Sequence, residues 1–195
     1  MSKIILITHQ KGGVGKSTLT FNMALALHND AKVAIIDLDL QGSLYKSRNN
    51  SEILVFPPSE LNNIQNLDFD FIFIDTPPYL TNELPKLCKM ANAIVIPTKT
   101  GIYDLLAIEE TIKIINQLGK ENITKIVFNM VKPNTSLTSE MKEALDNYNI
   151  SVADTFISDL VAFTRSPINN NLADEKAKLQ MENLTMEILK LTHNI

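Results

Sequence analysis

The sequence predicts an α/β fold in which a mainly parallel, twisted sheet carries helices on both faces. Short runs rich in Ile, Val and Phe recur along the 195 residues. Several of them lack polar alternation, as strands buried on both faces do. Segments with helical periodicity separate these runs. Such alternation of strand and helix is typical of a parallel sheet joined by crossover helices.

Each predicted element follows from a local pattern of this kind. Because no stretch has the composition of a linker, we expect a single domain over residues 1–195. Strands are predicted at Lys3–Thr8, Val33–Asp37, Phe69–Asp75, Ala93–Pro97 and Lys125–Met130, with a short one at Ile53–Phe56 and a weaker one at Ser151–Thr155. Helices are predicted at Ser17–His28, Ser59–Asn66, Asn82–Met90, Leu105–Leu118, Ser136–Tyr148 and Ala173–Leu191. The run Asn169-Asn170-Asn171 is predicted to be loop.

Composition excludes several classes of protein. The net charge of −4 argues against a strongly basic nucleic-acid protein. The single cysteine, Cys88, excludes a disulfide within the chain and a multi-cysteine metal site built by one subunit. The first apolar run is too short for a signal peptide, and no segment has the length of a membrane span. We therefore expect a cytoplasmic protein.

A glycine-rich loop is the most specific motif of the chain. Residues 11–18 read Lys-Gly-Gly-Val-Gly-Lys-Ser-Thr, directly after a predicted strand and directly before a predicted helix. Glycines permit unusual backbone angles, so successive N–H groups can surround a phosphate at the positive end of the helix. Lys16 adds a charge for the β- and γ-phosphates, and the Ser17 hydroxyl is placed for Mg²⁺. The predicted nucleotide-binding residues here are Lys11, Gly12, Gly13, Val14, Gly15, Lys16, Ser17 and Thr18.

The loop departs from the ordinary phosphate-loop pattern in one respect. Gln10 stands where that pattern has its first glycine, four residues before the Gly-Lys pair, and an additional lysine, Lys11, opens the loop. This is the deviant form of the motif, Lys-Gly-Gly-x-Gly-Lys-Ser/Thr.

Three carboxylates follow predicted strands and fall at the same edge of the sheet as the loop. Asp37 and Asp39 end one strand, two residues apart, and Asp75 ends another. In an open parallel sheet, ligands bind beyond the carboxyl ends of the strands. Because Mg²⁺ keeps several waters that need acceptors, such carboxylates suit a nucleotide–Mg²⁺ site.

Together these motifs resemble the ParA/MinD group of deviant Walker A ATPases, and most of all the small plasmid-type ParA partition ATPases. The segment Asp37-Leu-Asp-Leu-Gln-Gly-Ser43 is similar to the family's Asp-x-Asp-Pro-Gln-Gly, with Leu40 in place of proline, and Phe73-Ile-Asp-Thr-Pro-Pro78 is similar to its second acidic motif. The resemblance implies a P-loop NTPase fold, ATP and Mg²⁺ as cofactors, and hydrolysis of ATP to ADP and phosphate that is slow and stimulated by a partner.

The resemblance also implies roles for particular residues in catalysis. Lys16 would bind the phosphates. Lys11 would reach the partner's nucleotide across a two-fold dimer and offset developing charge, in the manner of an arginine finger. Asp39 would orient the attacking water.

The metal and the base would be held by other positions. Ser17 would bind Mg²⁺ directly, while Asp37 and Asp75 would hold waters on the metal. The division of roles between Asp37 and Asp39 stays open. The base would lie against Asn129, Val131 and Pro133.

The implied cycle is ATP-dependent homodimerisation, binding to a surface, and hydrolysis triggered by a small ParB-like or other adaptor protein. Nonspecific DNA, and with it the nucleoid, is one such surface. Family members commonly carry an arginine for DNA where this chain has Asp159. Either DNA binding would depend on other residues, such as Arg165, Lys176 and Lys178, or this member would hold a different surface.

Two alternatives remain. A MinD-like membrane switch would need a C-terminal amphipathic helix with a basic face. The stripe Ala177, Met181, Leu184, Ile188 and Leu191 instead has Glu182 and Glu187 on its other side, so we expect that helix to pack on its own domain, away from any membrane. A ligase or kinase of the same superfamily would need an acceptor pocket, and no constellation of side chains suggests one; His9, His28 and His193 are scattered.

Overall fold

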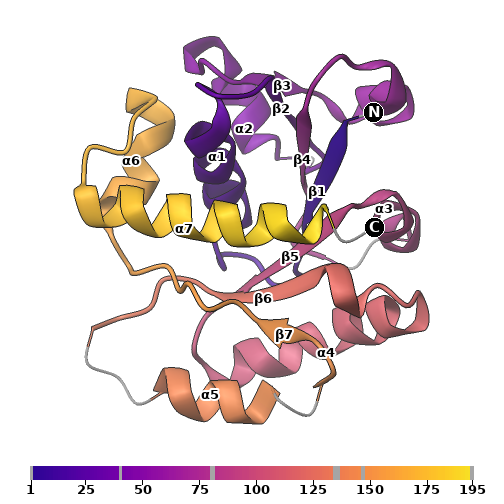
Figure 1. Cartoon of the computed structure of the whole chain (residues 1–195), viewed down its shortest axis with the longest axis vertical. Helices are drawn as coiled ribbons and strands as arrows, with labels where there is room; N and C mark the ends of the chain where they lie inside the picture. The colour runs from indigo at the N-terminus through magenta and orange to yellow at the C-terminus, as the bar shows by residue number, and fades with distance from the viewer. Residues whose placement is uncertain (1, 40, 80–81, 134–136, 146–147, 194–195) are drawn as a thin grey trace.

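The computed structural model describes the chain except residues 1, 40, 80–81, 134–136, 146–147 and 194–195, and it confirms the predicted α/β fold (Figure 1). Seven strands form one sheet in the order β3-β2-β4-β1-β5-β6-β7, and every pair of neighbours is parallel. The strands are β1 (Lys3–Ile7), β2 (Val33–Asp37), β3 (Leu54–Phe56), β4 (Phe71–Asp75), β5 (Ala93–Thr98), β6 (Thr124–Phe128) and β7 (Ser151–Val152).

Helices connect the strands and cover both faces of the sheet. They are α1 (Lys16–Leu27), α2 (Ser43–Ser47), α3 (Leu84–Met90), α4 (Ile102–Gln117), α5 (Leu137–Leu145), α6 (Val161–Asn169) and α7 (Glu175–Leu191), with 3₁₀ helices η1 (Arg48–Asn50), η2 (Pro58–Asn66) and η3 (Glu121–Ile123). The segment predicted as an α-helix at Ser59–Asn66 is therefore 3₁₀. Part of the predicted helix Ser136–Tyr148 lies outside the described residues.

Two helices escape prediction for identifiable reasons. The five residues of α2 are too few to establish a period. The sequence of α6 contains Pro167, a residue that normally interrupts helices, and α6 extends to Asn169, which was predicted to be loop. Asn170 then ends α6 in the left-handed conformation, with φ of 49°.

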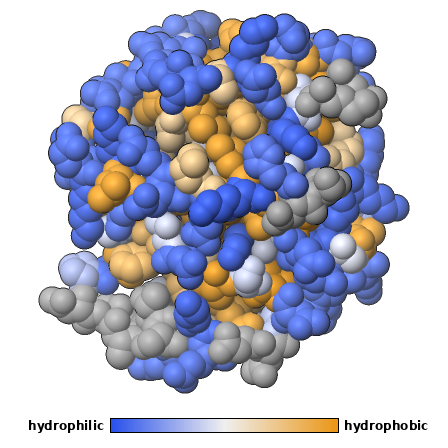
Figure 2. All heavy atoms as spheres, in the orientation of Figure 1, coloured by the Kyte–Doolittle hydropathy of each residue, from blue (hydrophilic) through white to orange (hydrophobic). Residues whose placement is uncertain are grey.

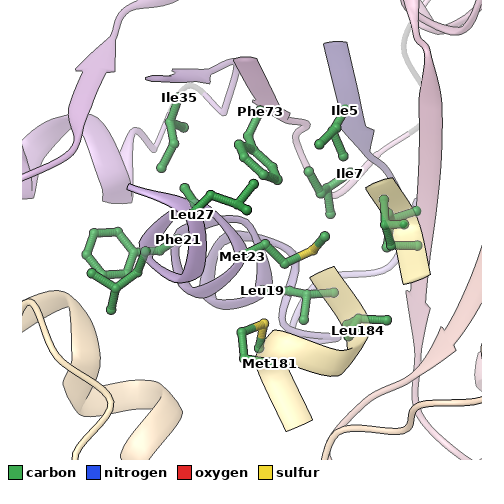
Figure 3. Close-up of a cluster of buried hydrophobic side chains, with 14 of the residues drawn as sticks. Ile5, Ile7, Leu19, Phe21, Met23, Leu27, Ile35, Phe73, Met181 and Leu184 are labelled. Carbon is green, nitrogen blue, oxygen red and sulfur yellow. The ribbon is translucent and has the colours of Figure 1, made fainter. Parts of the chain in front are cut away.

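The sheet separates two hydrophobic cores because successive side chains of a strand point to opposite faces. On one face, Ile5 and Ile7 of β1 pack with side chains of α1 and α7; on the other, Ile4 and Leu6 pack with α3, α4 and α5. Figure 3 shows the first core, in which Met23 of α1 lies between the sheet and α7. Each large aliphatic side chain buried in this way stabilises the fold by about 1.5–3 kcal/mol.

The C-terminal helix α7 packs on its own domain, as predicted. Its apolar stripe is buried: Ala177, Met181, Leu184, Ile188 and Leu191. The side chain of Asp174 caps the helix by accepting a hydrogen bond from the Ala177 N–H at 2.9 Å. On the molecular face that α7 crosses, hydrophilic side chains surround smaller groups of hydrophobic ones (Figure 2). Within the described residues, every helix is too short or too polar to span a bilayer.

Candidate nucleotide-binding site

The glycine loop connects β1 to α1 and has the backbone of an anion cradle. Gly13 and Gly15 have φ of 72° and 89°, which side chains rarely tolerate. A Cβ on Gly15 would stand 2.3 Å from Nδ2 of Asn129, so this position also needs glycine for space. No side chain caps the N-terminus of α1. Its first N–H groups are therefore available to a phosphate.

Lys16 holds its charge inside this cradle. The residue is only 7% exposed, and its Nζ donates a hydrogen bond to the Lys11 carbonyl at 3.1 Å. Burial lowers the pKa of the Lys16 ammonium, while nearby Asp75 and Asp39 act in the opposite direction. An anion in the loop would offset this cost of burial, which is the electrostatic condition for phosphate binding.

Two of the predicted carboxylates lie on adjacent strands at the carboxyl edge of the sheet. Asp37 and Asp75 are paired in register at the ends of β2 and β4. Asp75 is fully buried, and its Oδ2 accepts a hydrogen bond from Ser17 Oγ at 2.6 Å. Burial raises the pKa of the Asp75 carboxyl to about 7. The structure thus brings Ser17 and Asp75 together, as their predicted roles at the metal require.

Asp37 has a second task that the sequence did not reveal. Its Oδ1 accepts a hydrogen bond from the Asp39 N–H at 3.0 Å, and its Oδ2 accepts bonds from the N–H groups of Leu44 and Tyr45 at 3.1 and 3.0 Å. Asp37 therefore anchors the start of α2 and the turn that carries Asp39. Its role at the metal stays a prediction.

Lys11 is held by a residue that sequence reasoning missed. Its Nζ lies 2.7 Å from Oδ1 of Asp104, in the first turn of α4. The Asp104 side chain is 11% exposed and that of Lys11 is 41% exposed, so the lysine can leave the carboxylate toward solvent. Asp104 escaped prediction because it lies inside an ordinary helical pattern, far from the loop in sequence.

His9 supports the same end of the loop. It is buried, and its Nδ1 accepts a hydrogen bond from the Lys11 N–H at 2.8 Å. Burial, and after it the charge of Lys16, lower the pKa of His9 to about 4. The imidazole is therefore neutral at pH 7, with its proton on Nε2. Nothing in the sequence pattern connected His9 with the site, whereas the structure shows its ring hydrogen-bonded to the start of the loop.

The predicted base contacts lie at the other end of the loop. Asn129 is buried, and its Nδ2 donates a hydrogen bond to the Val14 carbonyl at 2.8 Å, so in this state the amide braces the loop. Val131 is buried and Pro133 is exposed. A small hollow opens beside Asn129. It is lined by residues of α1, of the turn after β6, of the segment that leads into α6, and of α6 and α7: Thr18, Leu19, Asn129, Met130, Ile157, Ser158, Asp159, Leu160, Phe163, Thr164 and Met181.

A sequence model of the CobQ/CobB/MinD/ParA nucleotide binding domain matches residues 5–173, which include the loop and all three strand-end carboxylates. The chain belongs to this family. ParA and MinD members of the family are ATPases, and relatives bind ATP or ADP with Mg²⁺.

One protein similar in sequence and two solved structures similar in fold illustrate the match. The "Maintenance of carboxysome distribution protein A" of Halothiobacillus neapolitanus is 25% identical over 170 residues, which are 78% of each chain. A plasmid partition protein from Borrelia burgdorferi, solved with AMPPNP, superposes with a TM-score of 0.74 at 20% identity and covers 97% of this chain and 99% of its own. Cobyrinic acid a,c-diamide synthase from Mycobacterium smegmatis, solved with ADP and magnesium, reaches 0.77 at 15% identity and covers 100% and 96%.

The residues present fit a Mg²⁺-nucleotide. The open cradle at Gly13, the buried ammonium of Lys16 and the Ser17–Asp75 pair supply an anion site beside a cation site. Within the described part of the chain, no group of three or more His, Cys, Asp or Glu side chains could hold a metal by itself. Mg²⁺ in nucleotide sites typically takes one or two protein ligands and completes its shell with phosphates and waters.

The raised pKa of Asp75 predicts how the stability of the nucleotide-free protein depends on pH. The carboxyl has its ordinary pKa of 3.8 in the unfolded chain and a pKa of about 7 in the fold. Between these two pH values, the folded state therefore binds a proton that the unfolded state has lost. This group therefore makes the fold less stable as the pH rises from about 4 to about 7. Asp75→Asn cannot ionise, and we expect it to raise the Tm above that of the wild type by about 3–6 °C at pH 8, and by much less at pH 5.

Thermal unfolding at both pH values, without nucleotide or Mg²⁺, measures this difference. The exposed carboxylate Asp159 offers a matched control, because Asp159→Asn removes an equal charge without relieving burial. A Tm difference for Asp75→Asn that does not change with pH would contradict the assignment.

Proposed function

We propose that this protein is an ATP-dependent, dimerising switch ATPase of ParA type, which partitions or positions DNA or another cargo through an adaptor protein. The observation that carries the proposal is the placement of Lys11, which stands at the mouth of the glycine loop and is paired with Asp104 of its own chain. A lysine that served only its own nucleotide would have no need of this outward position, because Lys16 already occupies the cradle.

The chain's own groups divide the work of hydrolysis. The loop N–H groups and Lys16 bind the phosphates, and Ser17 binds the metal with Asp75 behind it. Asp39 orients the attacking water, and the Lys11 of a second protomer offsets charge that develops on the γ-phosphate. When bound, Mg²⁺-ATP supplies the phosphoryl group and the metal's charge.

The ion pair with Asp104 gives Lys11 two alternative partners. In the monomer, the carboxylate neutralises the lysine, and its partly buried position strengthens the attraction relative to a fully exposed pair. In the ATP-bound dimer, the partner's phosphates compete for the same ammonium. Loss of the γ-phosphate on hydrolysis returns Lys11 to Asp104, so nucleotide state and dimerisation are coupled.

The charges around α6 and α7 bear on which surface such a dimer would bind. Arg165, Lys176 and Lys178 are exposed around α6 and α7, but exposed Asp159 and Glu182 stand among them. This mixture of charges favours attachment through a protein adaptor over strong, nonspecific DNA binding. Nonspecific DNA binding stays a prediction of the family resemblance.

Opposite effects of Lys11→Ala and Asp104→Ala on dimerisation would test the proposal. Lys11→Ala should lower the ATP-dependent dimer fraction more than it lowers nucleotide binding by the monomer, because the lysine meets a phosphate only across the dimer. Asp104→Ala should raise the dimer fraction at the same ATP concentration, because it removes the competing partner. Sedimentation velocity with Mg²⁺ and a nonhydrolysable ATP analogue measures both fractions.

Lys89→Ala serves as the control, since Lys89 is exposed at the end of α3. An unchanged dimer fraction in Lys11→Ala would refute the cross-dimer lysine. Measuring ADP release without any acceptor molecule distinguishes the proposed ATPase from a ligase or kinase. An enzyme that needs an acceptor would release no ADP under these conditions.

A further inference from the structure

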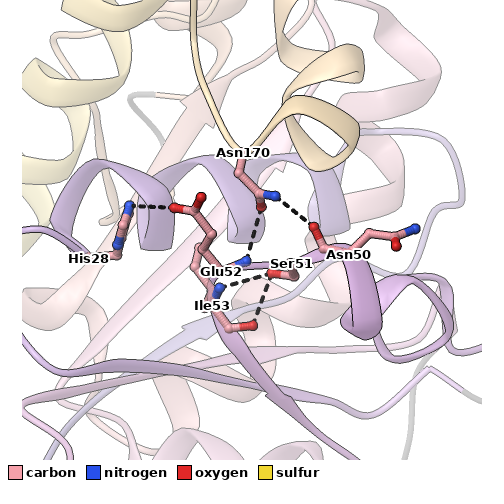
Figure 4. A network of polar contacts seen from close by, with 6 residues as sticks. All are labelled: His28, Asn50, Ser51, Glu52, Ile53 and Asn170. Atoms are coloured by element: carbon pink, nitrogen blue, oxygen red, sulfur yellow. Dashed lines mark hydrogen bonds and ion pairs between the residues drawn. The ribbon is translucent and has the colours of Figure 1, made fainter.

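Asn170 joins two parts of the chain that are 118 residues apart. Its Oδ1 accepts a hydrogen bond from the Glu52 N–H at 3.1 Å, and its Nδ2 donates one to the Asn50 carbonyl at 2.6 Å (Figure 4). Nε2 of His28, just beyond α1, lies 3.6 Å from Oε2 of the same Glu52. One amide side chain thus clips the corner between α6 and α7 onto the segment that leads from η1 into β3.

The clipped segment is the one that carries Asp39. It starts at Asp37, whose carboxylate anchors the beginning of α2, and continues through α2 and η1 to Asn50. Its part from α2 to η1 is internally braced, because the Arg48 guanidinium lies 3.9 Å from the centre of the Tyr45 ring and donates to the Tyr45 carbonyl at 2.7 Å. The segment is therefore a short, braced unit with one anchor at Asp37 and another at Asn170.

The element on the other side of the clip is fixed to the phosphate loop. Nδ2 of buried Asn22, on α1, donates hydrogen bonds to the Thr18 carbonyl at 2.8 Å and to the Phe163 carbonyl of α6 at 3.1 Å. The Asp39 segment is therefore connected to α1, the helix that begins at Lys16: Asn170 bonds the segment to the end of α6, and Asn22 bonds α6 to α1. The backbone of Asn170 is preset for this task, since asparagine tolerates its left-handed φ of 49° better than most residues.

We propose that Asn170 is a positioning residue for ATP hydrolysis, because it fixes the distal end of the segment that presents Asp39 to the phosphate loop. The inference rests on the proposed ATPase function and adds a residue that lies outside all of the motifs. Asn170 acts through the backbone of residues 50 and 52, which engages both ends of its amide. Its loss should therefore lower the rate of the chemical step and leave ATP binding intact.

Two variants of Asn170 and one neighbour make the test. Asn170→Asp keeps the acceptor for the Glu52 N–H but replaces the donor to the Asn50 carbonyl with an oxygen, so that bond is lost. Asn170→Gly removes both bonds while keeping the left-handed backbone angle accessible. Asn171→Asp is the matched control, since Asn171 is the next residue and is exposed. We expect kcat for ATP to fall about three- to tenfold in both Asn170 variants, as for loss of one or two hydrogen bonds, with KM unchanged.

Amide hydrogen exchange of the nucleotide-free proteins reports the clip itself. Exchange over residues 48–54 should become faster in both Asn170 variants and should stay at the wild-type rate in Asn171→Asp. Faster exchange with an unchanged kcat would overturn the positioning role while leaving the proposed function intact. A wild-type protein that binds ATP but lacks even slow hydrolysis would instead refute the proposed function, and the positioning role with it.

Discussion

Lys16→Ala is expected to abolish measurable ATP binding, with a loss of affinity of at least about 100-fold. The ammonium is the cation buried in the glycine cradle, and the Ala side chain leaves the phosphates with backbone N–H groups alone. The fold itself should not suffer, because the lysine is buried at a cost and its Nζ bonds only the Lys11 carbonyl within the described residues. Isothermal titration with ATP and Mg²⁺ measures the affinity.

A thermal-shift control distinguishes lost binding from lost structure. Without nucleotide, the Tm of Lys16→Ala should match or exceed that of the wild type, and the increase that ATP produces in the wild type should disappear. Lys113→Ala removes an exposed lysine that pairs with Glu110 along α4, and it should keep that increase. Normal turnover by Lys16→Ala would overturn the assignment of the loop.

The parts of the site that could be predicted from sequence are those set by strand ends. Asp37 and Asp75 follow runs of Ile, Val and Phe that have to be buried, and parallel strands bring their carboxyl ends to one edge. The loop is equally local, because its glycines and Lys16 act through backbone angles and a helix start that neighbouring residues determine. Local pattern therefore suffices to place the loop and these two carboxylates at one edge of the sheet, whereas their roles toward phosphate and metal stay predictions.

The residues that escaped prediction act through long-range contacts. Asp104 reaches Lys11 across the sheet edge from α4, and Asn170 reaches Asn50 from the end of α6. The helical pattern of α4 does not indicate which of its acidic residues will contact Lys11, 93 positions earlier. Likewise, the run of three asparagines predicts a loop whether or not the Asn170 amide forms hydrogen bonds. Such contacts depend on how helices pack, which periodicity alone does not specify.

Asn129 illustrates an intermediate case. Family resemblance placed it beside the base, and the structure puts it at the end of the loop, beside the hollow next to α1. Its amide nitrogen is nevertheless bonded to the Val14 carbonyl, so a base contact through that nitrogen would require the brace to open. This bonding state could not be inferred from the sequence, because it depends on a contact between residues that are 115 positions apart. The base contact itself stays a prediction.

The separation of Asp37 and Asp39 also needed the structure. Asp37 ends β2 and Asp39 comes two residues later, so in an extended chain the two carboxylates would point the same way. The chain instead turns after Asp37, which accepts three backbone hydrogen bonds, whereas Asp39 Oδ1 accepts one from the Gln41 N–H at 2.9 Å. Asp37 is thus built into the fold, and Asp39 is the carboxylate of the two with more freedom to meet a water.

Asp39→Ala should therefore slow ATP hydrolysis by about 100-fold or more while ATP binding persists, because a water-orienting carboxylate acts mainly on the transition state. The ATP-bound dimer should accumulate, since in the proposed cycle hydrolysis is the step that releases Lys11. Single-turnover hydrolysis, ATP affinity and sedimentation velocity measure the three quantities on one preparation. Asp37→Ala is the contrasting variant: it removes the anchor of α2, so its Tm should fall while that of Asp39→Ala stays near the wild type. Collapse of ATP affinity in Asp39→Ala, with normal turnover of the bound fraction, would move the water-orienting role to another residue.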